Sequence, residues 1–160
     1  MLTDYQQLSD TSRVWVYQAN PAFRQEDLPL VQMRIDQFVE NWISHNRQLK
    51  AYGGVQEGRF VVLMVDESLA DVSGCSIDSS VAFLKQLQAE FGVELFDRMV
   101  FAWQDGDQVK AADRDAFSQL YAQGLIHDDT LVYDPLVNNK KAFDEGWIKP
   151  LKESWHKRMV

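Results

Sequence analysis

The fold depends on the stretch Phe60-Val61-Val62-Leu63-Met64-Val65, the longest apolar run in the chain. A continuous apolar run of this length, rich in β-branched residues, is typical of a buried strand. The run continues into Asp66-Glu67-Ser68 and, after a short loop, into Ser73-Gly74-Cys75-Ser76 at the start of an amphipathic segment. We therefore predict a central strand whose acidic end lies beside the N-terminus of a helix.

Two amphipathic helices are predicted on either side of this strand in the sequence. From Asp27 to Ser44, apolar residues recur at steps of three and four, which places them on one helical face. The same spacing recurs from Ile77 to Phe91, with Ser76 as the expected N-cap and Gly92 just past the C-terminus. Each helix is expected to bury one apolar stripe.

Four other segments have the composition of strands. Residues 13–18 combine β-branched and aromatic side chains and stop at the turn signal Asn20-Pro21. Residues 49–57 form a ragged segment, expected at a sheet edge. Residues 99–109 predict a strand with an Asp-Gly hairpin turn, and residues 129–134 predict a last strand.

The order strand, helix, strand, strand, helix, strand predicts an α+β fold with a ferredoxin-like split βαβ core and a C-terminal extension. In that core we expect the first and third strands to be neighbours that run in the same direction. Gln18 and Asn20 would then lie beside Asp66 and Glu67, at the edge where the second helix begins.

Length and composition predict one folded domain over residues 1–160. The chain is 46% hydrophobic and 12% aromatic, which is typical of a globular protein. We expect a flexible leader at residues 1–11 and a basic, tryptophan-containing tail at residues 138–160 that packs on the body. Exposed tryptophans of that tail are an alternative surface for a protein partner.

The charge distribution bears on possible partners. The net charge of −8 disfavours nucleic acid and anionic lipid, so we expect no nucleic-acid partner. Residues 139–160 nevertheless carry six basic and three acidic side chains. This segment is expected to pair with the acidic body or with an acidic partner.

The single cysteine, Cys75, excludes an internal disulfide, so the fold does not require an oxidising compartment. The first residues lack the basic and apolar regions of a signal peptide, and no apolar run reaches the length of a membrane span. We expect a cytoplasmic location and no membrane span.

The leading functional prediction is a binding module for a small molecule or a protein partner, without a cofactor. Backbone donors and hydroxyls in the serine- and glycine-rich loop are able to hold a small anion, although helix capping explains the same residues. The residues predicted to bind share one sheet edge: Gln18, Asn20, Asp66, Glu67, Ser73, Gly74, Cys75 and Ser76.

The alternative prediction is a thiol-dependent enzyme with Cys75 as nucleophile. A helix N-terminus favours the thiolate, whereas the neighbouring carboxylates disfavour it, and a buried inert cysteine is the simpler interpretation. Such an enzyme needs a base, and His127 is the preferred candidate. His45 and His156 are expected to be structural or solvated, and whether the chain is an enzyme stays open.

Two other chemistries are not expected. Asp66 and Glu67 are possible oxygen ligands for a divalent metal, but their spacing matches no known ligand loop, so we predict no metal site. Gly53 and Gly58 have the glycine spacing of a P-loop, but Arg59 and Phe60 follow where a P-loop continues with lysine and serine or threonine.

Four segments together resemble a family of small uncharacterised bacterial proteins: residues 12–18, 65–68, 73–78 and 154–158. The resemblance spans nearly the whole chain. Members of this family often carry the automatic label of ABC transporter ATPase, which implies ATP hydrolysis. The chain has neither the Walker A lysine nor the L-S-G-G-Q signature of such enzymes, so we expect no ATP hydrolysis of the ABC type.

Overall fold

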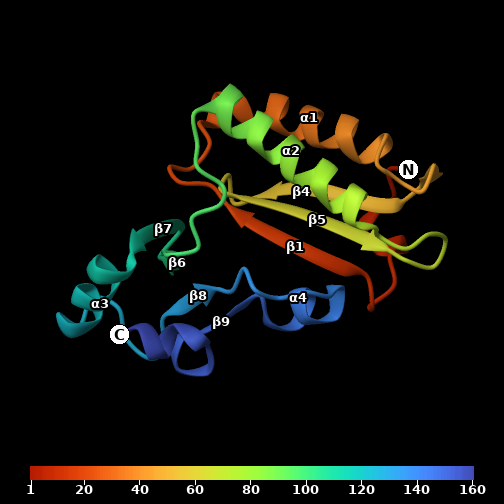
Figure 1. The fold of residues 1–160 in the computed structure, drawn as a ribbon. Helices are drawn as coiled ribbons and strands as arrows, with labels where there is room; N and C mark the ends of the chain where they lie inside the picture. Colours follow the sequence, from red (N-terminus) through yellow and green to blue (C-terminus); the bar gives the residue numbers. More distant parts are fainter.

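The computed structural model describes residues 1–160 and has an α+β fold, as predicted (Figure 1). The α-helices are α1 (Leu28–Glu40), α2 (Gly74–Phe91), α3 (Arg114–Ala122) and α4 (Lys140–Gly146). The strands are β1 (Arg13–Gln18), β2 (Ile43–Ser44), β3 (Arg47–Gln48), β4 (Lys50–Gln56), β5 (Phe60–Asp66), β6 (Val100–Asp105), β7 (Gln108–Asp113), β8 (Leu131–Tyr133) and β9 (Ile148–Pro150). Short 3-10 helices occupy Tyr5–Gln7, Gln25–Asp27, Leu151–Glu153 and Trp155–Met159.

Three antiparallel sheets organise these strands. The first has the order β1-β5-β4, the second has the order β7-β6-β8-β9, and β2 and β3 form a small hairpin. Helices α1 and α2 cover one face of the first sheet, while β8, β9 and α4 lie below its other face (Figure 1). The first sheet therefore lies between two layers.

Strand β5 is the centre of this arrangement, and all seven of its residues are buried. The odd-numbered residues 61–65 belong to the apolar cluster beneath α1 and α2. The even-numbered residues 60–64 belong to a second cluster shared with the opposite layer. Since successive side chains of a strand point to opposite faces, a strand covered on both sides needs a continuous apolar run.

Helix α1 approaches the sheet closely over β4. A Cβ atom added at Gly53 would lie 2.5 Å from Cγ2 of Ile35, so only glycine admits the helix at this distance. The helix ends at Glu40, before the expected Ser44, because the chain turns back as the β2–β3 hairpin. His45 and Asn46 form that turn with positive φ angles of 51° and 62°.

Helix α2 begins one turn earlier than predicted. Its N-cap is Ser73, and Ser76 stands at the third helical position as the reciprocal partner of a capping box. The predicted C-terminal glycine is confirmed, because Gly92 ends the helix with a φ of 67°.

The strand order corrects the predicted ferredoxin-like core in two respects. Strand β1 runs antiparallel to β5, with Arg13 opposite Val65 and Gln18 opposite Phe60. Strand β6 pairs with β7 and β8 in the second sheet instead of joining the first. The physical reason is the second apolar face of β1 and β5, which the second layer removes from water.

The first eleven residues differ from the expected flexible leader. Thr3 donates a backbone hydrogen bond to Ala51 at 2.8 Å, and Ala51 donates one to Met1 at 3.1 Å. Leu8 is buried in the cluster between the two layers. These contacts fix the segment along the outer edge of β4.

The C-terminal segment lies against the body. Trp147 is 6% exposed and stacks on Phe143 in the cluster between the layers. Lys149 pairs with Asp134 at 2.8 Å. Much of the basic charge of residues 139–160 is therefore neutralised by carboxylates of the same chain.

Candidate functional site

The structure separates the residues that the sequence predicted to form one site. Because β1 and β5 are antiparallel, Gln18 lies beside Phe60, at the end of β5 opposite to Asp66. Asn20 exchanges two backbone hydrogen bonds with Glu94, each 2.9 Å long. The expected edge that joins these residues to the loop before α2 does not form, because it depended on strands running in the same direction.

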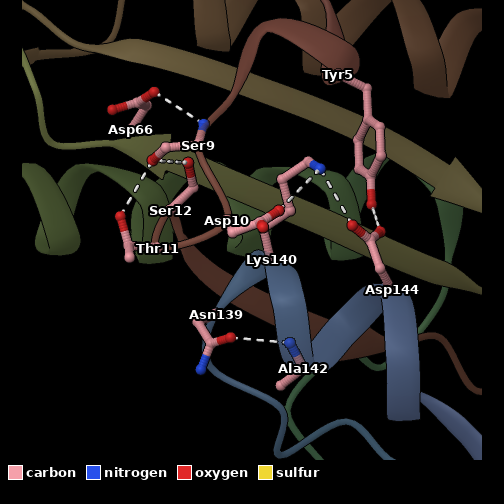
Figure 2. A network of polar contacts seen from close by, with 10 residues as sticks. All are labelled: Tyr5, Ser9, Asp10, Thr11, Ser12, Asp66, Asn139, Lys140, Ala142 and Asp144. Carbon is pink, nitrogen blue, oxygen red and sulfur yellow. Dashed lines mark hydrogen bonds and ion pairs between the residues drawn. The ribbon is translucent and has the colours of Figure 1, made fainter.

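Asp66 holds other parts of the chain together. Its carboxylate accepts hydrogen bonds from the backbone N–H groups of Ser9 and Ser68, each at 3.0 Å, and lies 3.4 Å from the ammonium of Lys50. Burial alone would raise the pKa of Asp66, but these donors and the Lys50 charge lower the pKa to about 2. Figure 2 shows the contact with Ser9, through which Asp66 anchors the N-terminal segment.

A second set of contacts in Figure 2 joins the N-terminal segment to α4. The Lys140 ammonium lies 3.1 Å from Asp144, 4.0 Å from Asp10 and 4.5 Å from the ring centre of Tyr5. The hydroxyl of Tyr5 donates to Asp144. The Lys140 side chain is only 10% exposed, so these partners compensate for removing its charge from water.

The loop before α2 satisfies its own polar groups. Glu67 accepts a hydrogen bond from the Val72 N–H at 2.9 Å. The Ser73 hydroxyl accepts from the Ser76 N–H at 3.1 Å, and the Ser76 hydroxyl accepts from the Ser73 N–H at 2.7 Å. Among the five principal cavities of the molecule, none is lined by Asp66, Glu67 or residues 73–76.

The structure does not bring together the predicted nucleophile and base. Cys75 is exposed at the start of α2, on the helical side of the first sheet. His127 is exposed in the loop before β8, which belongs to the opposite layer. His156 lies in the same layer as His127 but is buried, with its Nδ1 2.6 Å from the Ser154 hydroxyl.

The outer edge of β1 is unpaired in its middle, although Val16 and Gln18 are only 2% and 7% exposed. The odd-numbered residues of β1 bond to β5, so the N–H and C=O groups of even-numbered residues point outward. The Val14 N–H donates to Asn138 C=O at 3.1 Å near one end, and Asn20 bonds to Glu94 at the other. Between them, the outward N–H and C=O groups of Val16 and Gln18 have no hydrogen-bond partner.

Three adjoining cavities follow this edge and share Arg98 and Pro135. The first, about 190 Å³, lies along residues 13–16. The second, about 10 Å³, lies beside Gln18 and forms the narrow part. The third, about 430 Å³, lies between Leu136 and the C-terminal residues Trp155, Arg158 and Met159. We call these three cavities together the β1-edge groove.

Gln18 contributes an unsatisfied donor to the narrow part of the groove. Its side chain is on the apolar face of β1, the residue is 7% exposed, and its Nε2 atom is buried without a hydrogen-bond partner. Leaving such a donor unpaired costs about 1–3 kcal/mol.

The charge around the groove is opposite to that of the whole chain. Arg13, Arg98 and Arg158 are exposed, and none has a carboxylate within 4.0 Å, the limit for an ion pair. The Arg13 and Arg98 guanidinium groups lie 5.0 Å and 6.0 Å from the rings of Trp15 and Tyr17. Asp97 lines the narrow end and is the one carboxylate there.

The sequence pattern pointed to Gln18 but not to Arg98 or to the unpaired edge of β1. One signal was available: Gln18 follows Val14 and Val16 on the same face of a strand, and a polar side chain on an apolar face is informative. Arg98 lies in a loop whose sequence has no pattern that predicts its position beside β1.

Comparison of the chain with models of protein families, with curated proteins and with solved structures found no match. No helix combines the length and the apolar character needed to cross a membrane. No group of three or more histidine, cysteine or acidic side chains is arranged to hold a metal ion.

Proposed function

We propose that this chain is a binding module that takes an extended segment of a protein partner in the β1-edge groove. The observation that carries the proposal is the combination of unpaired backbone groups on Val16 and Gln18 with the buried, unpartnered Nε2 atom of Gln18. Folded proteins pair nearly all such groups with protein atoms or with water, so unpaired groups beside a cavity are available to a second molecule.

The two edges of the first sheet support this interpretation. An uncovered edge strand is a template for another chain, and proteins usually cover it. Along β4, the edge is covered by residues 1–3 and by Gln32, which bonds to the backbone of Gly53 and Val55. The edge of β1 has no such hydrogen-bond partners between its two end bridges.

The third cavity of the groove supplies apolar contact. Its walls include Leu136, which is 54% exposed, together with Trp155 and Met159. Its volume of about 430 Å³ lies within the range of roughly 300–1,000 Å³ that is typical of ligand pockets. A partner segment therefore finds hydrogen-bonding groups and an apolar surface side by side.

Selection of random ten-residue peptides against the immobilised chain tests the proposal without assuming a sequence. NMR spectra of the nitrogen-15-labelled chain then locate the bound peptide. We expect the signals of Val16, Gln18 and Arg98 to shift. Selected peptides that shift other residues instead, or the absence of any selected peptide, would contradict the proposal.

Two exposed leucines provide a matched control. Leu136 lines the groove and is 54% exposed, whereas Leu125 lies outside it and is 68% exposed. We expect Leu136→Ser to weaken peptide binding several-fold and Leu125→Ser to leave it unchanged. Equal effects of the two substitutions would place the peptide outside the groove.

A further inference from the structure

We infer that the segment bound in the β1-edge groove is an acidic peptide that adds to the first sheet as a short strand beside β1. This inference rests on the proposed function and specifies the chemistry and the geometry of the occupant. It draws on three features of the groove: its unpaired backbone groups, its free arginines and its apolar end.

The backbone of β1 already accepts antiparallel partners on this side. Arg13 forms an isolated bridge with Asn139, and Asn20 forms another with Glu94. Between these bridges, the outward N–H and C=O groups are unpaired on Val16, beside the cavity of about 190 Å³, and on Gln18, beside the narrow part of about 10 Å³. A segment in the wider cavity exchanges two backbone hydrogen bonds with Val16, whose N–H and C=O groups point outward there.

Free cations favour an acidic segment. In residues 139–160, the lysines 140, 149, 152 and 157 already form ion pairs with carboxylates of the chain. Arg13, Arg98 and Arg158 have no such partner, and their guanidinium groups suit carboxylates through paired N–H donors. Asp97 repels carboxylates from the narrow end, so they belong at the wider parts of the groove.

The apolar end of the groove predicts the side-chain pattern. Successive side chains of an added strand point to opposite faces. One set can then lie against Trp155, Met159 and Leu136, while the other reaches the arginines at the rim. We therefore expect bound peptides to alternate apolar and acidic residues.

Synthetic peptides test this pattern directly. The probe is a fluorescently labelled six-residue peptide of alternating glutamate and valine, and the control has lysine in place of glutamate. We expect fluorescence anisotropy to show at least tenfold tighter binding of the acidic peptide, weakened by added salt. Equal or tighter binding of the lysine peptide would overturn the inference.

Charge reversal identifies the residues that read the peptide. We expect Arg98→Glu and Arg158→Glu each to weaken the acidic peptide about fivefold or more. The matched control is Arg114→Glu on α3, because Arg114 is also exposed, has no ion pair and does not line the groove. An equal loss in the control would assign the effect to net charge.

Methylation of the peptide backbone distinguishes strand addition from side-chain binding. Only alternate residues of an added strand donate hydrogen bonds to β1. We expect N-methyl groups on one alternating set of residues to abolish binding, and N-methyl groups on the other set to be tolerated. Equal tolerance of both sets would overturn the strand geometry.

The outcomes separate this inference from the proposed function. If randomly selected peptides shift the signals of Val16 and Gln18 but are neutral or basic, the proposed function stands and the inference on the acidic strand is overturned. If no peptide of any composition shifts these signals, both are overturned.

Discussion

Two polar regions of this molecule differ in whether their hydrogen-bonding groups are satisfied. Around Asp66 and the loop at residues 73–76, carboxylates, hydroxyls and backbone donors bond to one another. In the β1-edge groove, Val16 and Gln18 have unpaired groups beside the cavities, and three exposed arginines have no ion-pair partner.

The first region attracted attention in the sequence because its polar residues are close together along the chain. The polar groups of the second region come together only after folding, when the loops that contain Arg98 and Pro135 approach β1. Polar residues that cluster in sequence therefore stabilise the fold here, whereas the unsatisfied groups that favour binding come from separated segments.

The largest expected effect is that of acid on the stability of the fold, through His156, which stacks on Trp155 at the apolar end of the groove. Burial lowers the pKa of His156 to about 4, while nearby Asp134 raises it and Lys149 lowers it. Below pH 6.5 the unfolded chain therefore takes up a proton that the folded chain excludes. We expect the free energy of unfolding to fall by about 3 kcal/mol between pH 6.5 and 4 from this group.

Urea unfolding at several pH values measures that loss, and His156→Gln is the control. The variant has no group that titrates in this range at this position, so its stability should depend less on pH. Identical pH profiles for the two proteins would show that His156 is not held neutral.

Asp66 gives the next largest expected effect and tests the region with satisfied groups. Its low pKa means that it stabilises the fold fully above about pH 4, and that the stabilisation is lost as the pH falls towards 2. We expect Asp66→Asn to lower the free energy of unfolding by about 2 kcal/mol at pH 7. Peptide binding should not change. A folded, stable variant that loses binding would contradict the interpretation that Asp66 supports the fold and not the binding site.

Gln18 should give the opposite result in the groove. Its Nε2 atom has no partner to lose, so Gln18→Met should leave stability unchanged or raise it by up to about 1 kcal/mol. Peptide affinity should fall, because the oxygen atom that this donor binds is then left unpaired. A loss of more than about 2 kcal/mol in urea unfolding would show that the amide supports the fold.

Cys75 is expected to give the smallest effect. Because the residue is exposed at the first turn of α2, Cys75→Ser should change the free energy of unfolding by less than about 0.5 kcal/mol. Peptide affinity should also remain the same. Loss of binding in this variant would return the site to the loop before α2.

The sequence was sufficient to predict the secondary structure around β5, because the patterns involved are local. The apolar run of β5 and the spacing of three and four in α1 and α2 depend only on neighbouring residues. The α+β class follows from these elements. Strand direction and the second layer do not, because they depend on which apolar faces meet after folding.

The candidate site was less predictable from the sequence, because its residues also meet only after folding. The N-terminal segment is polar in sequence, yet its backbone bonds to Ala51 and its Ser9 N–H bonds to Asp66. Asp66 therefore became a structural anchor through a residue 57 positions away. Gln18 was among the residues predicted to bind, but its neighbours in the groove were not.

Amide hydrogen exchange of β1 in the free chain tests the central claim most directly. The backbone N–H groups of the odd-numbered residues donate to β5, whereas the N–H groups of Val16 and Gln18 point away from β5 towards the groove. We predict slow exchange at Trp15 and Tyr17 and fast exchange at Val16 and Gln18, with the fast pair slowed by a bound peptide. Equal protection of all four amides in the free chain would contradict an unpaired edge and, with it, the proposed site.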